Sequence, residues 1–77
     1  MTTANAPQGA QAALRAVRLL KLFTGDRAEM ALRDVSQLSG LNKTTTHRLL
    51  QALQSESLID RNPATGAYRL GTGIMAL

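Results

Sequence analysis

The feature that most restricts the fold is a short break at residues 40–42, which separates two segments with helical hydrophobic periodicity. Before the break, apolar residues recur every three positions between Leu32 and Leu38. After it, the segment 43–55 places apolar residues at the i, i+3, i+4 and i+7 spacing of a helix. Gly40 accepts the positive φ that ends a helix, and Asn42 is a strong N-cap for the next one. These features predict a helix-turn-helix.

The length and composition limit the classes of protein to which the chain can belong. Its 77 residues suffice for one small domain, and without cysteine it has no disulfides, thiolate zinc sites or thiol nucleophiles. With 44% hydrophobic and 18% charged residues, we expect a soluble globular domain held together by its core. The N-terminus lacks the basic start and apolar stretch of a secretory signal, so a cytoplasmic location is expected.

A first helix and a β-hairpin are predicted on either side of this pair of helices. Residues 1–11 are expected to form a flexible tail, and a helix should run from Ala12 to about Thr24. The apolar stripe expected to face the core consists of Ala13, Ala16, Val17, Leu20 and Phe23. A polar link covers residues 25–29. Residues 58–62 and 67–70 are expected to form two strands, joined by a turn from Pro63 to Gly66.

The fold class predicted from these elements is mainly α with a small β-hairpin. It is a winged helix-turn-helix in which a three-helix core carries the hairpin as a wing, and it should occupy residues 12–70. The core side of the third helix is expected to consist of Thr46, Leu49, Leu50 and Leu53.

The opposite side of the third helix has the composition of a DNA-binding surface. No acidic residue occurs between Val35 and Ser55, and the net charge of the chain is +4. The candidate DNA-binding residues of this helix are Lys43, Thr44, Thr45, His47, Arg48 and Gln51. Arg48 can pair with the O6 and N7 edge of guanine, and Gln51 with the N6 and N7 edge of adenine.

Other candidate contacts are expected to reach the phosphate backbone. Lys43, Thr44 and Thr45 lie at the predicted helix N-terminus, where free N–H groups and the helix dipole attract phosphate oxygens. In the predicted wing, Arg61 and Arg69 flank the hairpin tip, where they could contact the backbone or the adjacent minor groove. Arg69 can instead pair with Asp60 across the hairpin, in a surface ion pair worth under about 1 kcal/mol.

Plainer interpretations of these residues remain open. Arg48 can be an ordinary solvated side chain, and the run of threonines can reflect only the preference of hydroxyls for helix starts. His47 is the only histidine, and without a second imidazole or a thiol nearby it is not expected to bind a metal. We expect no enzyme activity, cofactor or metal, because the chain shows no nucleophile with a base and no glycine-rich phosphate loop.

The main alternative function is a winged helix used for protein contact. Such an interface would need apolar or aromatic anchors on the exposed side of the third helix, and the sequence has none there.

The order of these elements, together with two sequence stretches, resembles the DNA-binding domain of IclR-type transcriptional regulators. The stretches are Gly40-Leu41-Asn42-Lys43-Thr44-Thr45-Thr46-His47-Arg48-Leu49-Leu50 and Tyr68-Arg69-Leu70-Gly71. The resemblance implies that residues 43–48 and Gln51 match the recognition helix. It also implies that residues 71–77 begin a linker helix towards an effector-binding domain that is missing here. Dimers or tetramers of such regulators bind palindromic operators on double-stranded DNA.

Two positions depart from the family pattern. Ala31 stands where a capping Ser or Thr is common, and Ser57 stands where a Gly commonly follows the third helix. Each departure is expected to cost about 1 kcal/mol of stability, and neither changes the predicted DNA-binding side.

A homodimer interface is expected at apolar residues that have no visible partner within the chain. Leu19 and Leu22 fall outside the main stripe of the first helix, and Ile74, Met75 and Leu77 follow the predicted wing. Burial of such side chains in a two-fold dimer would be favourable.

Overall fold

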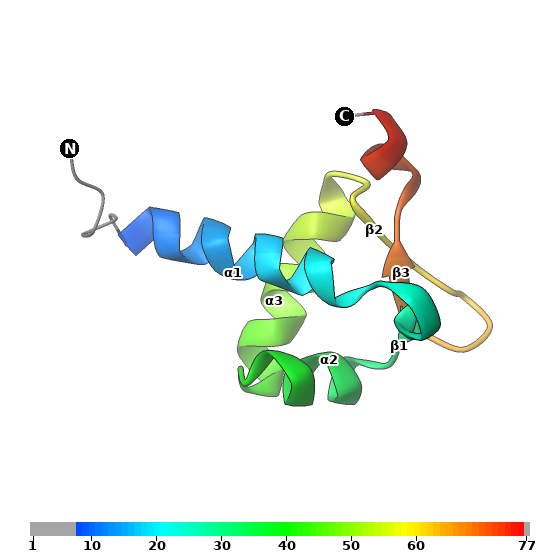
Figure 1. The fold of residues 1–77 in the computed structure, drawn as a ribbon, viewed down its shortest axis with the longest axis horizontal. Helices are drawn as coiled ribbons and strands as arrows, with labels where there is room; N and C mark the ends of the chain where they lie inside the picture. Colours follow the sequence, from blue (N-terminus) through cyan, green and yellow to red (C-terminus); the bar gives the residue numbers. More distant parts are fainter. Residues whose placement is uncertain (1–7, 77) are drawn as a thin grey trace.

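The structure, a computed structural model, describes residues 8–76 and has three α-helices and a three-stranded antiparallel sheet (Figure 1). The helices are α1 (Gln8–Leu22), α2 (Leu32–Ser39) and α3 (Lys43–Ser55). The strands are β1 (Glu29–Met30), β2 (Ile59–Arg61) and β3 (Tyr68–Leu70), in the order β1-β3-β2. Two short 3-10 helices are η1 (Gly25–Arg27) and η2 (Thr72–Ala76). This confirms the predicted winged helix-turn-helix class.

The turn between α2 and α3 has the predicted chemistry. Gly40 has φ 76°, and its N–H donates to the Ser36 carbonyl oxygen at 3.0 Å. The Asn42 side-chain oxygen accepts from the Thr45 N–H at 2.8 Å and so caps α3. The Ser36 hydroxyl donates to the Leu41 carbonyl oxygen across the turn. A helix end leaves backbone N–H and C=O groups without partners, and these bonds supply some of those partners. α2 therefore ends, and α3 begins, where the sequence predicts.

The core forms where the three helices meet the sheet. Its fully buried members come from all of these elements, namely Leu19, Val35, Leu50, Ile59 and Tyr68. Phe23, Met30 and Leu53 are nearly as buried. In α3, Thr46, Leu50 and Leu53 are buried and Leu49 is partly buried, as predicted. This packing fixes which side of α3 remains in solvent.

The predicted orientation of α1 is partly confirmed, since Phe23 is buried and Ala16 and Leu20 pack against the core, but Ala13 and Val17 are exposed. Leu19 is completely buried and Leu22 packs partly against the core, whereas Val17 is half exposed. The sequence offers two adjacent apolar stripes, and the core lies between them, so Leu19 of the second stripe is buried together with Phe23 of the first. The N-terminal half of α1 also extends past the rest of the domain (Figure 1), so its apolar residues have no surface to pack against.

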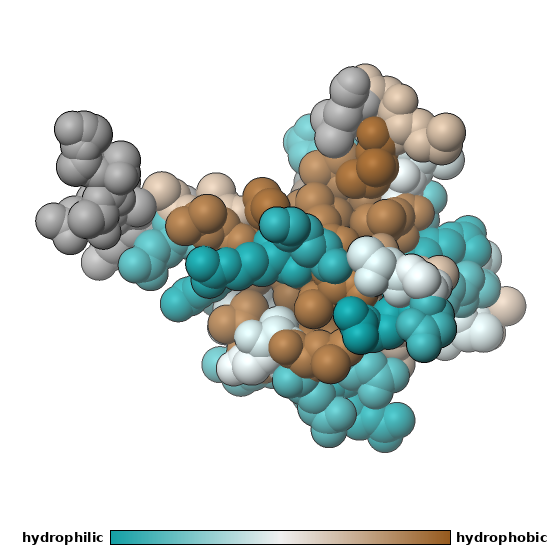
Figure 2. All heavy atoms as spheres, viewed as in Figure 1, coloured by the Kyte–Doolittle hydropathy of each residue, from teal (hydrophilic) through white to brown (hydrophobic). Residues whose placement is uncertain are grey.

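This orientation corrects the predicted dimer interface as well. Leu19 lies inside the monomer and cannot contact a second copy, while Leu22 and Ile74 are partly buried. Leu77 lies outside the described residues. Exposed hydrophobic side chains are visible along α1 in Figure 2, and the large ones among them are Leu14 and Val17.

Several predicted boundaries also change. α1 begins at Gln8, so residues 8–11 belong to the helix and not to the predicted tail, of which residues 1–7 lie outside the described range. The link predicted at residues 25–29 contains η1 and the start of β1, a strand too short to show a periodic pattern. Where a linker helix was expected to begin, Thr72–Ala76 form a 3-10 helix.

The segment after β3 lies directly against the end of α3. The N–H groups of Gly71 and Gly73 donate to the carbonyl oxygens of Leu58 and Ser57, each at 2.8 Å. A Cβ at either glycine would overlap the Ser57 carbonyl oxygen, so neither position has room for a side chain. Ser57 itself has φ 62°, the left-handed conformation for which glycine is usual. The Ser57 departure from the family pattern therefore carries the expected backbone strain.

A stability prediction follows from Thr46. Its side chain is completely buried in α3, and its hydroxyl has no hydrogen-bond partner among the described residues. Replacement by the isosteric valine removes this buried polar group, so Thr46→Val should raise the free energy of unfolding by about 1–2 kcal/mol. Urea denaturation measures the change. Thr44→Val, at an exposed position of the same helix, is the control and should have little effect.

Candidate DNA interface

The six candidate residues of α3 lie on the side of the helix away from the core. Lys43, Thr44, Arg48 and Gln51 are exposed, and Thr45 and His47 are half-buried. The buried residues of the same helix occupy the opposite side, as the 3.6-residue repeat requires. In Figure 1, α3 lies behind α1 and α2. Nothing in the described part of the chain covers its exposed side.

Arg48 makes no hydrogen bond or ion pair within the described part of the molecule. Its guanidinium is therefore free to contact a ligand. It is close to the middle of α3, with Thr44 and Gln51 one turn away on either side. A guanidinium in this position offers two parallel N–H donors, the geometry that reads the edge of a guanine.

The N-terminus of α3 is only partly available to a phosphate. The Thr45 N–H already donates to Asn42, so it cannot also bind an incoming oxygen. Lys43 and Thr44 begin the helix and remain exposed. Their side chains and the positive end of the helix dipole are therefore the groups that can bind an anion here.

The arginines of the wing are engaged within the protein. The Arg61 Nε donates to the Gly66 carbonyl oxygen at 2.9 Å, and its guanidinium carbon lies 4.9 Å from the centre of the Tyr68 ring. The Arg69 Nη1 forms an ion pair with Glu29 Oε2 at 3.3 Å. The sequence suggested Asp60 as an alternative partner of Arg69. Asp60 does lie opposite Arg69 in the sheet, but the observed ion pair is with Glu29.

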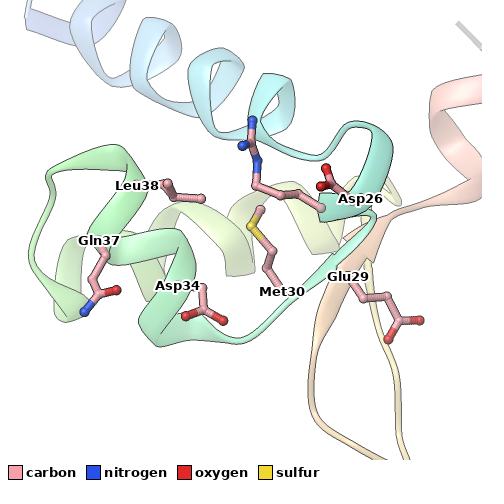
Figure 3. A pocket seen from close by; sticks show the side chains of 7 residues that line it. Asp26, Glu29, Met30, Asp34, Gln37 and Leu38 are labelled. Carbon is pink, nitrogen blue, oxygen red and sulfur yellow. The ribbon is translucent and has the colours of Figure 1, made fainter.

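Acidic side chains gather on a different surface from the exposed side of α3. Asp26, Glu29 and Asp34 line a hollow of about 330 Å³ between η1, β1 and α2 (Figure 3). They are three of the five acids in the sequence. Because negatively charged carboxylates repel the negatively charged phosphates of DNA, this surface is unsuited to DNA. Within residues 8–76, no group of three or more His, Cys, Asp or Glu residues is placed to hold a metal ion.

None of the described helices combines the length and the apolar character that crossing a bilayer requires.

Comparison with known proteins agrees with the fold and with the composition of α3. The sequence matches the family model described as IclR helix-turn-helix domain over residues 12–63. It is 46% identical over 61 residues to the HTH-type transcriptional regulator XynR of Escherichia coli K12, covering 79% of this chain and 24% of that protein. It is 41% identical over 71 residues to the DNA-binding transcriptional repressor YiaJ of the same organism, covering 92% of this chain and 25% of that protein.

Solved structures of IclR regulators have the same fold. A regulator from Silicibacter sp. TM1040 matches with a TM-score of 0.82 and 34% identity, covering 84% of this chain and 26% of that one. A homologue from Microbacterium hydrocarbonoxydans, solved in complex with 4-hydroxybenzoate, matches with a TM-score of 0.77 and 26% identity, covering 83% and 26%. The chain spans about a quarter of the length of these relatives. Since the family match includes more than half of its residues, this chain belongs to the IclR helix-turn-helix family of transcriptional regulators.

Proposed function

We propose that this chain binds double-stranded DNA sequence-specifically, with α3 in the major groove and the β2-β3 wing beside it. The observation that carries the proposal is the exposed side of α3, which is free of acids and presents Lys43, Arg48 and Gln51 without any cover from the described residues. The major groove is wide enough to admit one α-helix, and these side chains match phosphate oxygens and base edges.

In the parent protein, this binding would regulate transcription under the control of a small molecule. One relative is named a transcriptional repressor, and the homologue from M. hydrocarbonoxydans was solved with 4-hydroxybenzoate. Repression controlled by an effector that binds outside this chain is therefore our proposal for the whole protein. Because the chain spans about a quarter of the length of these relatives, we place the effector site in the part of such a regulator that this chain does not cover.

Protein contact through α3 is the competing function. Interfaces of that kind are centred on large apolar or aromatic anchors. In the described chain, the large exposed hydrophobic side chains are on α1, α2, β3 and η2, and none of them is on α3.

A salt titration separates DNA binding from protein contact. Neutralising phosphates makes DNA affinity fall steeply as salt rises from about 50 to 200 mM, and protein contact through a polar surface gives a much smaller slope.

A prediction for Arg48 tests whether α3 reads bases. We expect Arg48→Ala to lose about 1–3 kcal/mol more binding free energy on a specific duplex than on a random one, because a base-edge contact disappears together with a charge. The specific duplex is recovered from a randomised pool by selection with the wild-type chain, and fluorescence anisotropy measures both affinities.

The matched control is Arg18→Ala, which removes the same charge from an exposed position of α1. This variant should weaken binding to both duplexes slightly and equally. Equal losses on both duplexes for Arg48→Ala would make Arg48 a phosphate contact and remove it from base recognition.

A second prediction concerns the homodimer, which we propose to form through α1. Leu14 and Val17 are 48% and 50% exposed, they lie one turn apart, and no described residue covers them. Two copies related by a two-fold axis would bury these side chains and present two α3 helices to successive major grooves, about 34 Å apart.

Sedimentation equilibrium tests this interface. The wild-type chain should dimerise with increasing concentration, and the Leu14→Ser, Val17→Ser double variant should stay folded and monomeric. Leu38→Ser is the control, since it removes an equally exposed apolar side chain from α2 and should leave dimerisation unchanged. A wild type that stays monomeric, or a double variant that dimerises equally well, would contradict the proposal.

A further inference from the structure

A row of three charged residues crosses the outer side of the sheet. Arg69 lies on the central strand, β3, and the register places it opposite Glu29 of β1 and opposite Asp60 of β2. Residues directly opposite each other in a sheet share one side of it, so both acidic residues lie on the same side of the sheet as Arg69. The observed ion pair joins Arg69 to Glu29, and the described residues show none between Arg69 and Asp60.

The carboxylate of Glu29 also holds the base of the wing. Its Oε1 accepts from the Asn62 Nδ2 at 3.4 Å, and its Oε2 accepts from the Arg69 Nη1 at 3.3 Å. Asn62 in turn organises the hairpin turn. Its side-chain oxygen accepts from the Ala64 N–H at 2.9 Å, and its N–H donates to the Ala67 carbonyl oxygen at 2.7 Å. One side chain of β1 therefore connects the wing to the body of the domain.

Of the two wing arginines, Arg69 has an acidic partner within the described residues and Arg61 has none, so Arg61 keeps its full positive charge. Arg69 is paired with Glu29, and Arg61 is held against Gly66 and Tyr68 on the other side of the hairpin. The tip between them, residues 63–65, is Pro-Ala-Thr and carries no ionisable side chain. The pairing of Arg69 with Glu29 therefore lowers the contribution of the wing to the charge attraction that all DNA sequences share, while the wing can still contribute its shape and position to a DNA complex.

We propose that Glu29 is a positioning residue that determines how well the domain discriminates between DNA sequences. It fixes the wing through Asn62 and withholds the charge of Arg69 from the phosphates. The inference rests on the proposed DNA binding. An unpaired arginine beside the duplex would strengthen binding to every DNA sequence. Arg69 paired with Glu29 adds less to such non-specific binding, and the bond from Asn62 to Glu29 keeps the wing in one position relative to α3.

The central test compares Glu29→Gln with Asp60→Asn. Both substitutions remove one negative charge from the same row of the sheet, so they change the net charge equally, but only the first breaks the ion pair with Arg69. The probes are the duplex selected with the wild-type chain and a scrambled duplex of the same composition. Each is about 30 base pairs long, roughly three helical turns.

Glu29→Gln should bind the scrambled duplex several-fold more tightly than wild type does. Its plot of log affinity against log salt should be steeper by about 1, the effect of one additional phosphate contact. The ratio of selected to scrambled affinity should fall at least about threefold. Asp60→Asn should change both affinities by a similar small factor and keep that ratio. A residue that served only to stabilise the fold would instead weaken binding when it is replaced.

A charge-exchange variant checks the role of the pair itself. Glu29→Arg combined with Arg69→Glu keeps the net charge and restores an ion pair across the same register. It should therefore recover much of the wild-type affinity ratio and salt slope. Thermal unfolding followed by circular dichroism shows whether each variant is folded, and Glu29→Gln keeps an amide oxygen that can still accept from Asn62.

The outcomes separate this inference from the proposed function. Equal effects of Glu29→Gln and Asp60→Asn would overturn the role of Glu29, since net charge alone would then explain both. A folded exchange variant that loses DNA binding would also overturn it, because Arg69 would then be a direct contact. A wild-type chain without salt-dependent DNA binding would overturn both the inference and the proposed function.

Discussion

The position of α3 depends on one short turn, in which the left-handed Gly40 ends α2 and Asn42, two residues later, caps α3. Gly40 closes α2 through its N–H bond to Ser36, and Asn42 opens α3 through its bond to Thr45. A residue with a Cβ pays about 1 kcal/mol or more for the conformation of Gly40, although the space around that position is open. The angle between the two helices therefore depends on backbone conformation as much as on packing, and this angle exposes one side of α3.

The helix-turn-helix could be predicted from the sequence because its determinants are local. Gly40, Asn42 and the apolar spacing of residues 43–55 act within a few positions of one another, and the observed bounds of α2 and α3 follow them. The orientation of α1 could not be predicted in the same way. Two apolar stripes compete on that helix, and only the shape of the remaining domain decides that Leu19 is buried and Val17 is exposed.

The wing shows a different limit of sequence analysis. Arg61 and Arg69 are correctly predicted to lie on the hairpin, but sequence position does not reveal whether a charge is free or paired. The partner of Arg69 is Glu29, forty residues earlier in the chain, on a two-residue strand that has no periodic signal. Asp60 is much nearer in sequence and lies opposite in the sheet, which explains why it was the natural candidate. Pairings between distant segments of this kind require the three-dimensional structure.

The distribution of charge also leads us to expect that one copy of this domain would bind DNA weakly by itself. The net charge is only +4, and Arg69 is paired with Glu29. Within the described residues, the cations of α3 and the wing that have no acidic partner are Lys43, Arg48 and Arg61. Few phosphate contacts mean low affinity for any sequence at physiological salt. Two linked copies overcome this limit, because the second binding event becomes intramolecular and occurs at a high effective concentration. Low non-specific affinity in each copy then becomes an advantage, since only a site with two correctly spaced half-sites gains the full benefit of both domains.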